Sequence, residues 1–457
     1  MTEDVRILSP CGMLGYGFPE SSFLRGMEEA PHGIVVDAGS TDAGPHKLGA
    51  GVSIVSRRAA KKDLEIIITN GLRKKIPIII GSAGGAGARR HVEWTLEIID
   101  EILAEAQLKA TTAVIWADIP DKDVLNACQQ GKIKPLSPNV KELNEAVIEE
   151  TNGIVAQMGH EPIVEALKNG SDIIVCGRAY DPSPFAAIGI FFQKDAGLSY
   201  HLGKILECGA LCAEPGTTKD CILGIIKNHS FTVKSLNPSR KCSSISVAAH
   251  TFYEKEHPYI LHGPGFTLDL GECKFKELDG GEVEVTNSKF IRNEKYYIKL
   301  EGARQVAFRT CVIAGIRDPI LLENLAEIER SVEQQVRDYY PEIAHDDFTL
   351  NFYNYGMNAV LGKKETEPFH GHEVGVLLEV AGKTQELANT ICATARSTLL
   401  HFGHENRKST AGNLAFPFAP SDVEFGPVYE FSVYHLMEVD ENPFKIEYRR
   451  MPDAILI

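Results

Sequence analysis

The sequence predicts an α/β protein in three parts: an N-terminal domain with a doubly wound, mostly parallel sheet, a β-rich bridge, and a C-terminal α+β domain of the ferredoxin-like βαββαβ type. Short apolar runs alternate with amphipathic segments through the first 180 residues, which predicts the parallel sheet. After residue 310 the pattern is strand, helix, strand, strand, helix, strand, which predicts the ferredoxin-like domain. We therefore expect one domain over residues 1–220, and the bridge with the ferredoxin-like domain over residues 221–457.

The N-terminal apolar runs have the length and composition of strands that are buried on both faces. They are Val5–Leu8, Gly33–Asp37, Ile76–Ile80, Thr112–Trp116, Gly153–Gln157 and Asp172–Cys176. The clearest helix between them runs from His91 to Glu105, where an apolar stripe lies opposite acidic side chains. Further helices are predicted at Lys61–Lys74, Val140–Glu150 and Pro162–Lys168. This alternation implies right-handed crossovers between parallel strands.

The second half has a different pattern. Alternating apolar and polar residues at Gly281–Thr286 and Lys295–Lys299 predict strands in the bridge. The elements of the ferredoxin-like domain are predicted at Cys311–Gly315, Pro319–Tyr339, Phe348–Tyr353, Val374–Val380, Lys383–Phe402 and Val428–Tyr434.

Composition limits the classes of function. Hydrophobic residues make up 44% and charged residues 24% of the 457 positions, which is typical of a globular protein with large cores. A formal charge of −15 without a basic run argues against nucleic acid and membrane surfaces as partners. The ten cysteines form no paired framework and no targeting segment is visible, so we expect a cytoplasmic protein with reduced thiols.

Polar residues follow several predicted strands, at the edge where open α/β sheets bind ligands. The first group follows Gly33–Asp37 and contains Asp37, Ser40, Thr41 and Asp42. Its oxygens could bind Mg²⁺, or one aspartate could act as a general base. The alternative is a loop whose side chains cap the following backbone. No other cofactor is evident.

A glycine-rich loop follows the third predicted strand and precedes the helix at His91. Its candidate binding residues are Gly81, Ser82, Gly84, Gly85 and Arg89. The glycines allow close approach of a ligand, and a helix N-terminus attracts anions. The spacing fits neither the dinucleotide fingerprint nor the P-loop, so we expect binding of a carboxylate or another anion, or else a structural turn.

Two further strand ends contribute candidates for substrate binding. Gln157 ends one apolar run, and Arg178 and Asp181 follow another. Arg178 could pair with a substrate carboxylate through two hydrogen bonds. The alternative is an internal ion pair between Arg178 and Asp181.

The segment around residues 200–212 offers Glu207 and Cys208 as catalytic candidates. Glu207 is the better acid–base group, because its charge raises the pKa of the neighbouring Cys208 thiol and weakens it as a nucleophile. In a continuous helix His201, Cys208 and Cys212 would share a face, which leaves a zinc site as an alternative. His250 precedes a predicted helix and is a further catalytic candidate.

Several long motifs together resemble the acyclic terpene utilisation AtuA family. They are Gly33-Ile-Val-Val-Asp-Ala-Gly-Ser-Thr-Asp42, Gly203-Lys-Ile-Leu-Glu-Cys-Gly209, Ala213-Glu-Pro-Gly216, Ser246-Val-Ala-Ala-His-Thr-Phe-Tyr253, Leu300-Glu-Gly-Ala-Arg304 and Ala314-Gly-Ile-Arg-Asp-Pro319. The resemblance implies a role in the breakdown of branched terpenoid acids through CoA thioesters. We expect a homo-oligomer. Because some longer relatives carry a small C-terminal domain, a small separate subunit could complete this protein.

Three functions fit these observations. The first is a lyase or hydro-lyase (hydratase) that acts on a small branched carboxylic acid or its CoA thioester, with Asp37, Asp42 or Glu207 moving a proton beside the carbonyl. Glycine-loop N–H groups and Arg178 would then hold the oxyanion or the carboxylate. The alternatives are a nucleotide- or phosphate-dependent transferase and a non-catalytic subunit of a two-protein enzyme.

Overall fold

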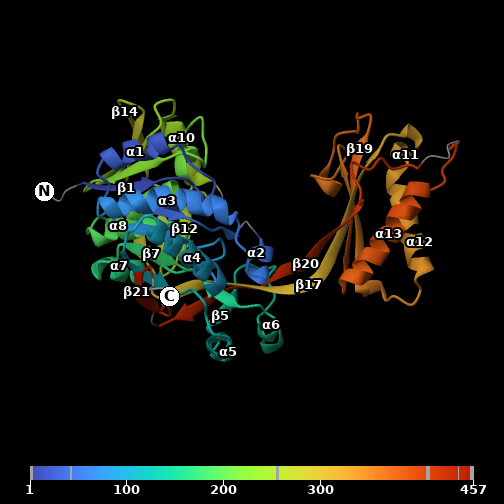
Figure 1. Cartoon of the computed structure of the whole chain (residues 1–457), viewed down its shortest axis with the longest axis horizontal. Coiled ribbons are helices and arrows are strands. Elements are labelled where there is room, and N and C mark those ends of the chain that lie inside the picture. Colours follow the sequence, from blue (N-terminus) through green and yellow to red (C-terminus); the bar gives the residue numbers. More distant parts are fainter. Residues whose placement is uncertain (1–3, 42–43, 254–256, 408–411, 441, 453–457) are drawn as a thin grey trace. The chain divides into compact units, whose positions relative to one another are not determined.

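The computed structural model describes residues 4–452 except 42–43, 254–256, 408–411 and 441. The chain divides into two units, one formed by residues 1–304 with 431–457 and the other by residues 305–430 (Figure 1). Strands β17 (Tyr296–Ile316) and β20 (Asp422–Val439) carry the chain from one unit into the other. None of the described helices has the length and apolar character that crossing a membrane requires.

A mixed sheet forms the centre of the first unit. In the described residues it has ten strands in the order β14-β15-β10-β9-β1-β2-β3-β7-β4-β21. The five strands from β1 to β4 in this order are parallel. Their bounds are β1 Val5–Ser9, β2 Gly33–Asp37, β3 Ile78–Gly81, β7 Ile173–Cys176 and β4 Ala110–Ile115. A mixed α/β protein with a large sheet is thus confirmed.

The bridge supplies the antiparallel strands on one side of this sheet. They are β9 Ile222–Ile226, β10 Ser230–Ser235, β14 Lys274–Leu278 and β15 Glu282–Thr286, and β21 (Ile446–Met451) pairs with β4 on the other side. Because β9 pairs directly with β1, the bridge belongs to the first unit. The limits of the two units therefore differ from the predicted boundary after residue 220.

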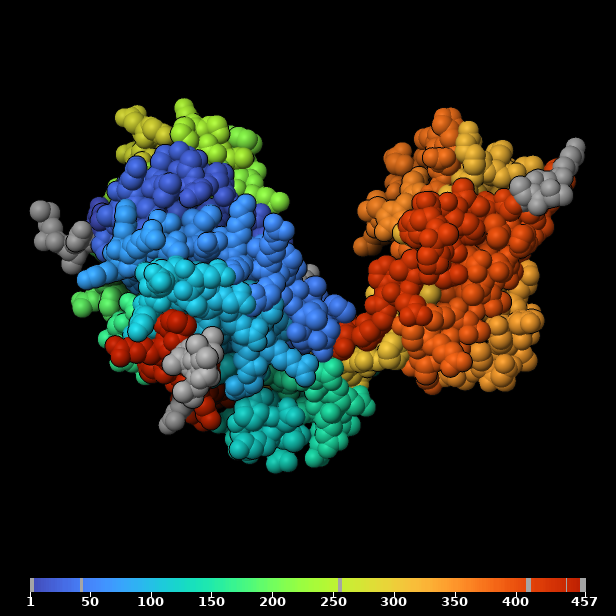
Figure 2. Space-filling view, in the orientation of Figure 1, coloured from blue at the N-terminus to red at the C-terminus, as the bar shows by residue number. Residues whose placement is uncertain are grey.

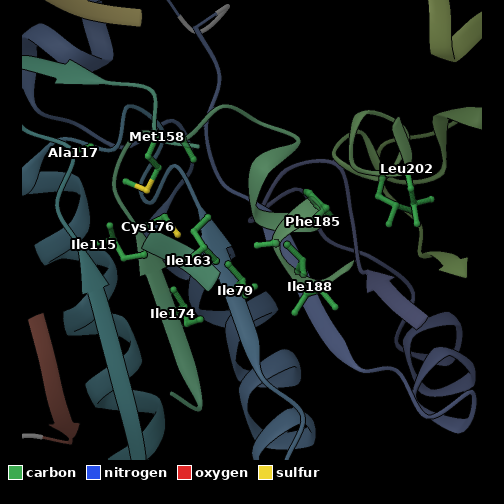
Figure 3. Packing of buried hydrophobic residues seen from close by; sticks show 14 of the residues in the cluster. Ile79, Ile115, Ala117, Met158, Ile163, Ile174, Cys176, Phe185, Ile188 and Leu202 are labelled. Atoms are coloured by element: carbon green, nitrogen blue, oxygen red, sulfur yellow. The ribbon is translucent and has the colours of Figure 1, made fainter. Parts of the chain in front are cut away.

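Helices cover both faces of the parallel strands, because alternate side chains of a strand point to opposite faces. Ile34 and Ile78 face one core, and Val35 and Ile79 face the other. Helices α1 (Glu20–Glu28), α3 (Arg57–Arg73) and α4 (Arg89–Glu105) pack on the first core. Helices α7 (Glu161–Lys168), α8 (Ser183–Phe191) and α9 (Ala196–Leu206) pack on the second. Figure 3 shows Phe185 and Ile188 of α8 beside Ile79, and Figure 2 shows the blue and cyan N-terminal segments at the surface of this unit.

Two predicted elements differ from the structure. The run Gly153–Gln157 is not part of the parallel sheet: it forms β6 (Ile154–Ala156), which pairs antiparallel with β17. A short apolar run does not specify which strand it pairs with. The alternation of strands and helices in the sequence therefore assigned β6 to the wrong sheet. The helix predicted from Val140 is shorter, α6 (Glu145–Glu149), because Asn144 accepts a hydrogen bond from the Val147 N–H and caps its start.

The remaining elements of the first unit surround these layers. They are α2 Pro45–Ala50, α5 Asp121–Gln129, β5 Ile133–Pro135, β8 Ala213–Glu214, β11 Lys241–Cys242, α10 Ser244–Phe252, β12 Ile260–Gly263, β13 Phe266–Asp269 and β16 Lys289–Arg292.

The second unit contains the predicted order of strands and helices. After β17 come α11 (Pro319–Glu323), α12 (Leu325–Tyr339), β18 (Phe348–Tyr355), β19 (Val374–Gly382), α13 (Gln385–His401) and β20. The single helix predicted at Pro319–Tyr339 is divided at Asn324. Strands β18, β19, β17 and β20 are neighbours in this order, and α12 and α13 contribute to one core with them. Assignment to the ferredoxin-like fold stays a prediction.

A buried carboxyl in this unit makes its stability depend on pH. Oε1 of Glu329 on α12 and Oδ1 of Asn354 on β18 are buried without a hydrogen-bond partner among the described residues. Burial raises the pKa of Glu329 from 4.5 to about 7. A hydrogen bond with Asn354 favours the ionised form and offsets only part of this rise.

We expect Glu329→Gln to remove this pH dependence. Because the unfolded chain releases the proton near pH 4.5 and the folded unit near pH 7, stability falls as the pH rises through this window, by about 3 kcal/mol in all. Urea unfolding at pH 5 and pH 8 should show a larger loss of stability in the wild type than in the variant. Glu333→Gln, one turn along α12, is the control, and an equal pH dependence in all three proteins would contradict the prediction.

Candidate functional site

Three strand ends meet at one edge of the parallel sheet. Strands β2, β3 and β7 are parallel neighbours, so their carboxyl ends lie side by side. Asp37 ends β2, Ser82 follows β3, and Arg178 follows β7. The structure thus brings together candidates that lie far apart in the sequence.

Glycines let the loops at this edge approach each other. A Cβ on Gly39 would clash with the carbonyl oxygen of Gly85, and a Cβ on Gly87 would clash with the backbone nitrogen of Arg178. Gly87 also has a φ of +66°, which disfavours other residues. Gly81 lies against Asp37, since a Cβ there would be 3.5 Å from Oδ1.

Arg178 is 1% exposed and lies at the centre of the polar group. Its Nε donates to Oε2 of Glu301 at 3.0 Å, and Nη1 donates to Oδ1 of Asp181 at 2.8 Å. Nη1 also donates to Ser82 Oγ at 3.0 Å, and Nη2 donates to Thr41 Oγ1 at 2.8 Å. Of the two alternatives for Arg178, the structure contains the internal ion pair with Asp181. The guanidinium therefore positions neighbouring side chains.

Glu301 of β17 also belongs to this polar group. Its Oε1 accepts hydrogen bonds from Thr41 at 2.8 Å and from Gln157 Nε2 at 3.0 Å, and lies 3.1 Å from Lys299 Nζ. Burial opposes ionisation of Glu301, but the positive charges of Arg178 and Lys299 outweigh it and lower its pKa to about 2. Glu301 is therefore a buried anion that fixes the positions of Arg178, Thr41 and Gln157.

Asp37 has the opposite electrostatic environment. Its side chain is buried, and one oxygen accepts a hydrogen bond from the Gly39 N–H at 3.2 Å. Burial and the negative charge of Asp181 raise its pKa, Arg178 partly offsets them, and Glu207 raises it further. Because the Asp181 side chain is 34% exposed, solvent reaches the group beside Asp37. Asp37 is therefore a buried carboxyl group whose surroundings favour its protonated form.

A second arm of the site comes from α9 and α10. Lys204 Nζ lies 2.6 Å from Glu207 Oε1, and its ammonium lies over the Tyr253 ring, 4.8 Å from the centroid. Cys208 Sγ is 3.0 Å from the Tyr253 hydroxyl, and the His250 ring stacks on Tyr253. Burial, and then the Glu207 charge, raise the pKa of Cys208 to about 12, which makes it a poor nucleophile.

Asp37 and Glu301 of the first group, and Lys204, Glu207, Cys208, His250 and Tyr253 of the second, lie in the motifs that carry the family resemblance. A family model described as acyclic terpene utilisation family protein AtuA matches residues 57–404 of the chain. The chain belongs to the AtuA family. Arg178, Glu207 and Glu301 lie inside the matched range, and Asp37 precedes it. Neither a search of the curated proteins nor a search of the solved structures finds a match.

Some candidates of this AtuA-family protein lie outside the group. Gly84 and Gly85 face His91 and Ile54, where a Cβ would collide with these residues. The Arg89 guanidinium lies over the Trp116 ring, 4.0 Å from its centroid. These three residues support the packing of the loop and of α4. Ser40 is half-buried in the loop after β2, and Asp42 lies outside the described residues.

The structure describes part of what two of the predicted binding modes require. The glycine-loop N–H groups of Ala83, Gly85 and Gly87 donate to backbone carbonyls, so they do not form an open cradle for an anion. In the part of the chain that the structure describes, no group of three or more His, Cys, Asp or Glu residues could hold a metal ion. Because Asp42 is outside that part, Mg²⁺ stays a prediction.

The zinc alternative fails for a geometric reason. Helix α9 ends at Leu206, so Cys208 and Cys212 do not continue the helical face of His201. The ring nitrogens of His201 instead lie 2.7 Å from Ser288 Oγ and 3.1 Å from Thr251 Oγ1.

Three residues of the site, Glu301, Lys204 and Tyr253, are not among those predicted from the sequence. Each lies inside one of the motifs that carry the family resemblance, at Leu300–Arg304, Gly203–Gly209 and Ser246–Tyr253. A charged or phenolic residue inside such a motif was the available signal. Their contacts with Arg178, Glu207 and Cys208 depend on the fold.

Proposed function

We propose that this protein is a lyase or hydro-lyase that acts on a branched carboxylic acid or its CoA thioester in terpenoid or carboxylic-acid catabolism. The observation that carries the proposal is the buried Asp37 carboxyl at the end of β2, whose pKa is raised by burial and by Asp181. The family description, acyclic terpene utilisation, supports the substrate class.

In the proposed mechanism Asp37 transfers the proton at the carbon beside the substrate carbonyl. Because the pKa of Asp37 is raised, its protonated form is more accessible, which is the property that a carboxyl group needs to act as a general acid. Arg178 holds Asp181 beside Asp37, and Glu301 holds Arg178, so both are positioning residues. Lys204 forms an ion pair with Glu207, whose charge acts on Asp37. The ammonium group of Lys204 supplies a positive charge that favours a developing oxyanion.

A substrate panel tests the proposed reaction. The purified protein is incubated with branched α,β-unsaturated carboxylic acids and with their CoA thioesters, and mass spectrometry records products heavier by one water. Hydration of at least one branched compound, faster than hydration of its straight-chain analogue, supports the proposal. Full recovery of every compound with folded protein present contradicts it.

A further inference from the structure

A second cluster of reactive side chains lies where α9 meets the start of β14. Cys273 Sγ is 3.8 Å from Nδ1 of His201 and 3.7 Å from Oγ of Ser288. Ser288 Oγ is 2.7 Å from the same Nδ1, and Thr251 Oγ1 is 3.1 Å from Nε2. The cluster shares no residue with the group around Asp37.

This arrangement has the parts of an activated nucleophile: a thiol, a base within reach, and a third group that orients the base. His201 and Thr251 are 0% exposed, so packing fixes the imidazole. When Thr251 accepts a hydrogen bond from Nε2–H, Nδ1 carries the lone pair that takes up a proton. The Ser288 hydroxyl is within reach of both the sulfur and Nδ1 and can relay that proton.

The other described cysteines are less suited to react. Cys11, Cys176, Cys212, Cys221, Cys242, Cys311 and Cys392 are buried. Cys128 and Cys208 are half-buried like Cys273, and burial raises the pKa of both thiols, whereas the distinguishing feature of Cys273 is the imidazole nitrogen of His201 at 3.8 Å. Cys273 thus combines access for a reagent with an adjacent base.

We propose that Cys273 is a reactive thiol that adds to α,β-unsaturated carbonyl compounds, with His201 as the base that takes up its proton. The sulfur forms a bond to the β-carbon, and the π electrons of the C=C bond move to the α-carbon. That carbon then receives the proton that the thiol gave to His201, so no further reactant is needed.

N-Ethylmaleimide, itself an α,β-unsaturated carbonyl compound, is the probe. The full-length protein is treated with a substoichiometric amount at pH 7, and peptide mass spectrometry compares Cys273 with Cys128 in the same sample. We expect modification of Cys273 to be several-fold faster than that of Cys128, because an adjacent base raises the share of reactive thiolate. An equal or slower rate at Cys273 overturns the proposal.

Two further measurements test the role of His201. In the wild type the rate at Cys273 should reach half its maximum below pH 8.5, the ordinary thiol pKa, and a midpoint at or above that value contradicts the proposal. In His201→Gln, and in Ser288→Ala if the first variant does not fold, the ratio of the two rates should fall toward one. A folded variant that keeps the wild-type ratio also overturns it.

Discussion

Replacing Asp37 by asparagine is expected to lower turnover of the substrate found in the panel by about 10²- to 10⁴-fold, the usual contribution of a general acid–base group. Asparagine keeps the shape of the side chain and an oxygen that can accept from Gly39, but it cannot exchange the proton. Because burial makes the Asp37 charge unfavourable, the variant should remain folded. Steady-state kinetics, with thermal unfolding as a check of the fold, measures both effects.

Asp118→Asn is the matched control for Asp37→Asn. Asp118 follows β4, and burial raises the pKa of this carboxyl too, but its contact is with the backbone N–H of Arg89. The turnover of Asp118→Asn should stay within a factor of a few of the wild-type value. Similar activity in both variants would remove Asp37 from the mechanism.

The second large effect concerns stability. Glu301→Gln leaves the guanidinium of Arg178 buried without its strongest ionic partner, which is expected to cost about 3 kcal/mol. The lowered pKa of Glu301 leads to the same magnitude, because the difference between 4.5 and about 2 corresponds to about 3 kcal/mol. This stabilisation is fully present above pH 4.5 and is lost as the pH falls toward 2.

Urea unfolding of Glu301→Gln at pH 7 and pH 3 measures this contribution. The loss of unfolding free energy relative to the wild type should be large at pH 7 and smaller at pH 3, because at pH 3 this carboxyl is protonated in the unfolded chain but still ionised in the folded protein. Glu150→Gln is the control, since Glu150 also pairs with an arginine, Arg304, but its side chain is 60% exposed. An exposed pair contributes below about 1 kcal/mol. An equal effect of both substitutions would show that Glu301 is not the anchor of Arg178.

Sequence patterns located elements more reliably than they paired them. The apolar run Gly33–Asp37 matches β2 at both ends, because a buried strand bounded by polar residues is a strong local signal. The equally apolar Gly153–Gln157 was assigned to the wrong sheet. Pairing is decided by packing against segments such as β17, which is distant in the sequence.

The same distinction applies to the site. The positions of Asp37, Ser82 and Arg178 after predicted strands were enough to place them at one edge of the sheet, because the carboxyl ends of neighbouring parallel strands lie side by side. This reasoning could not identify Glu301, which contacts Thr41 across 260 positions of the chain. It also left open whether Arg178 faces a substrate or Asp181.

The amino-acid sequence alone determined the membership in the AtuA family, the mixed α/β character and the polar strand ends. These depend on composition, periodicity and motifs, which are local properties of the chain. Only the tertiary structure decided that Asp37 becomes a carboxyl of raised pKa while Glu301 becomes a permanent anion. Both are buried acids, and their pKa values differ because folding places Asp37 beside Asp181 and Glu301 between Arg178 and Lys299.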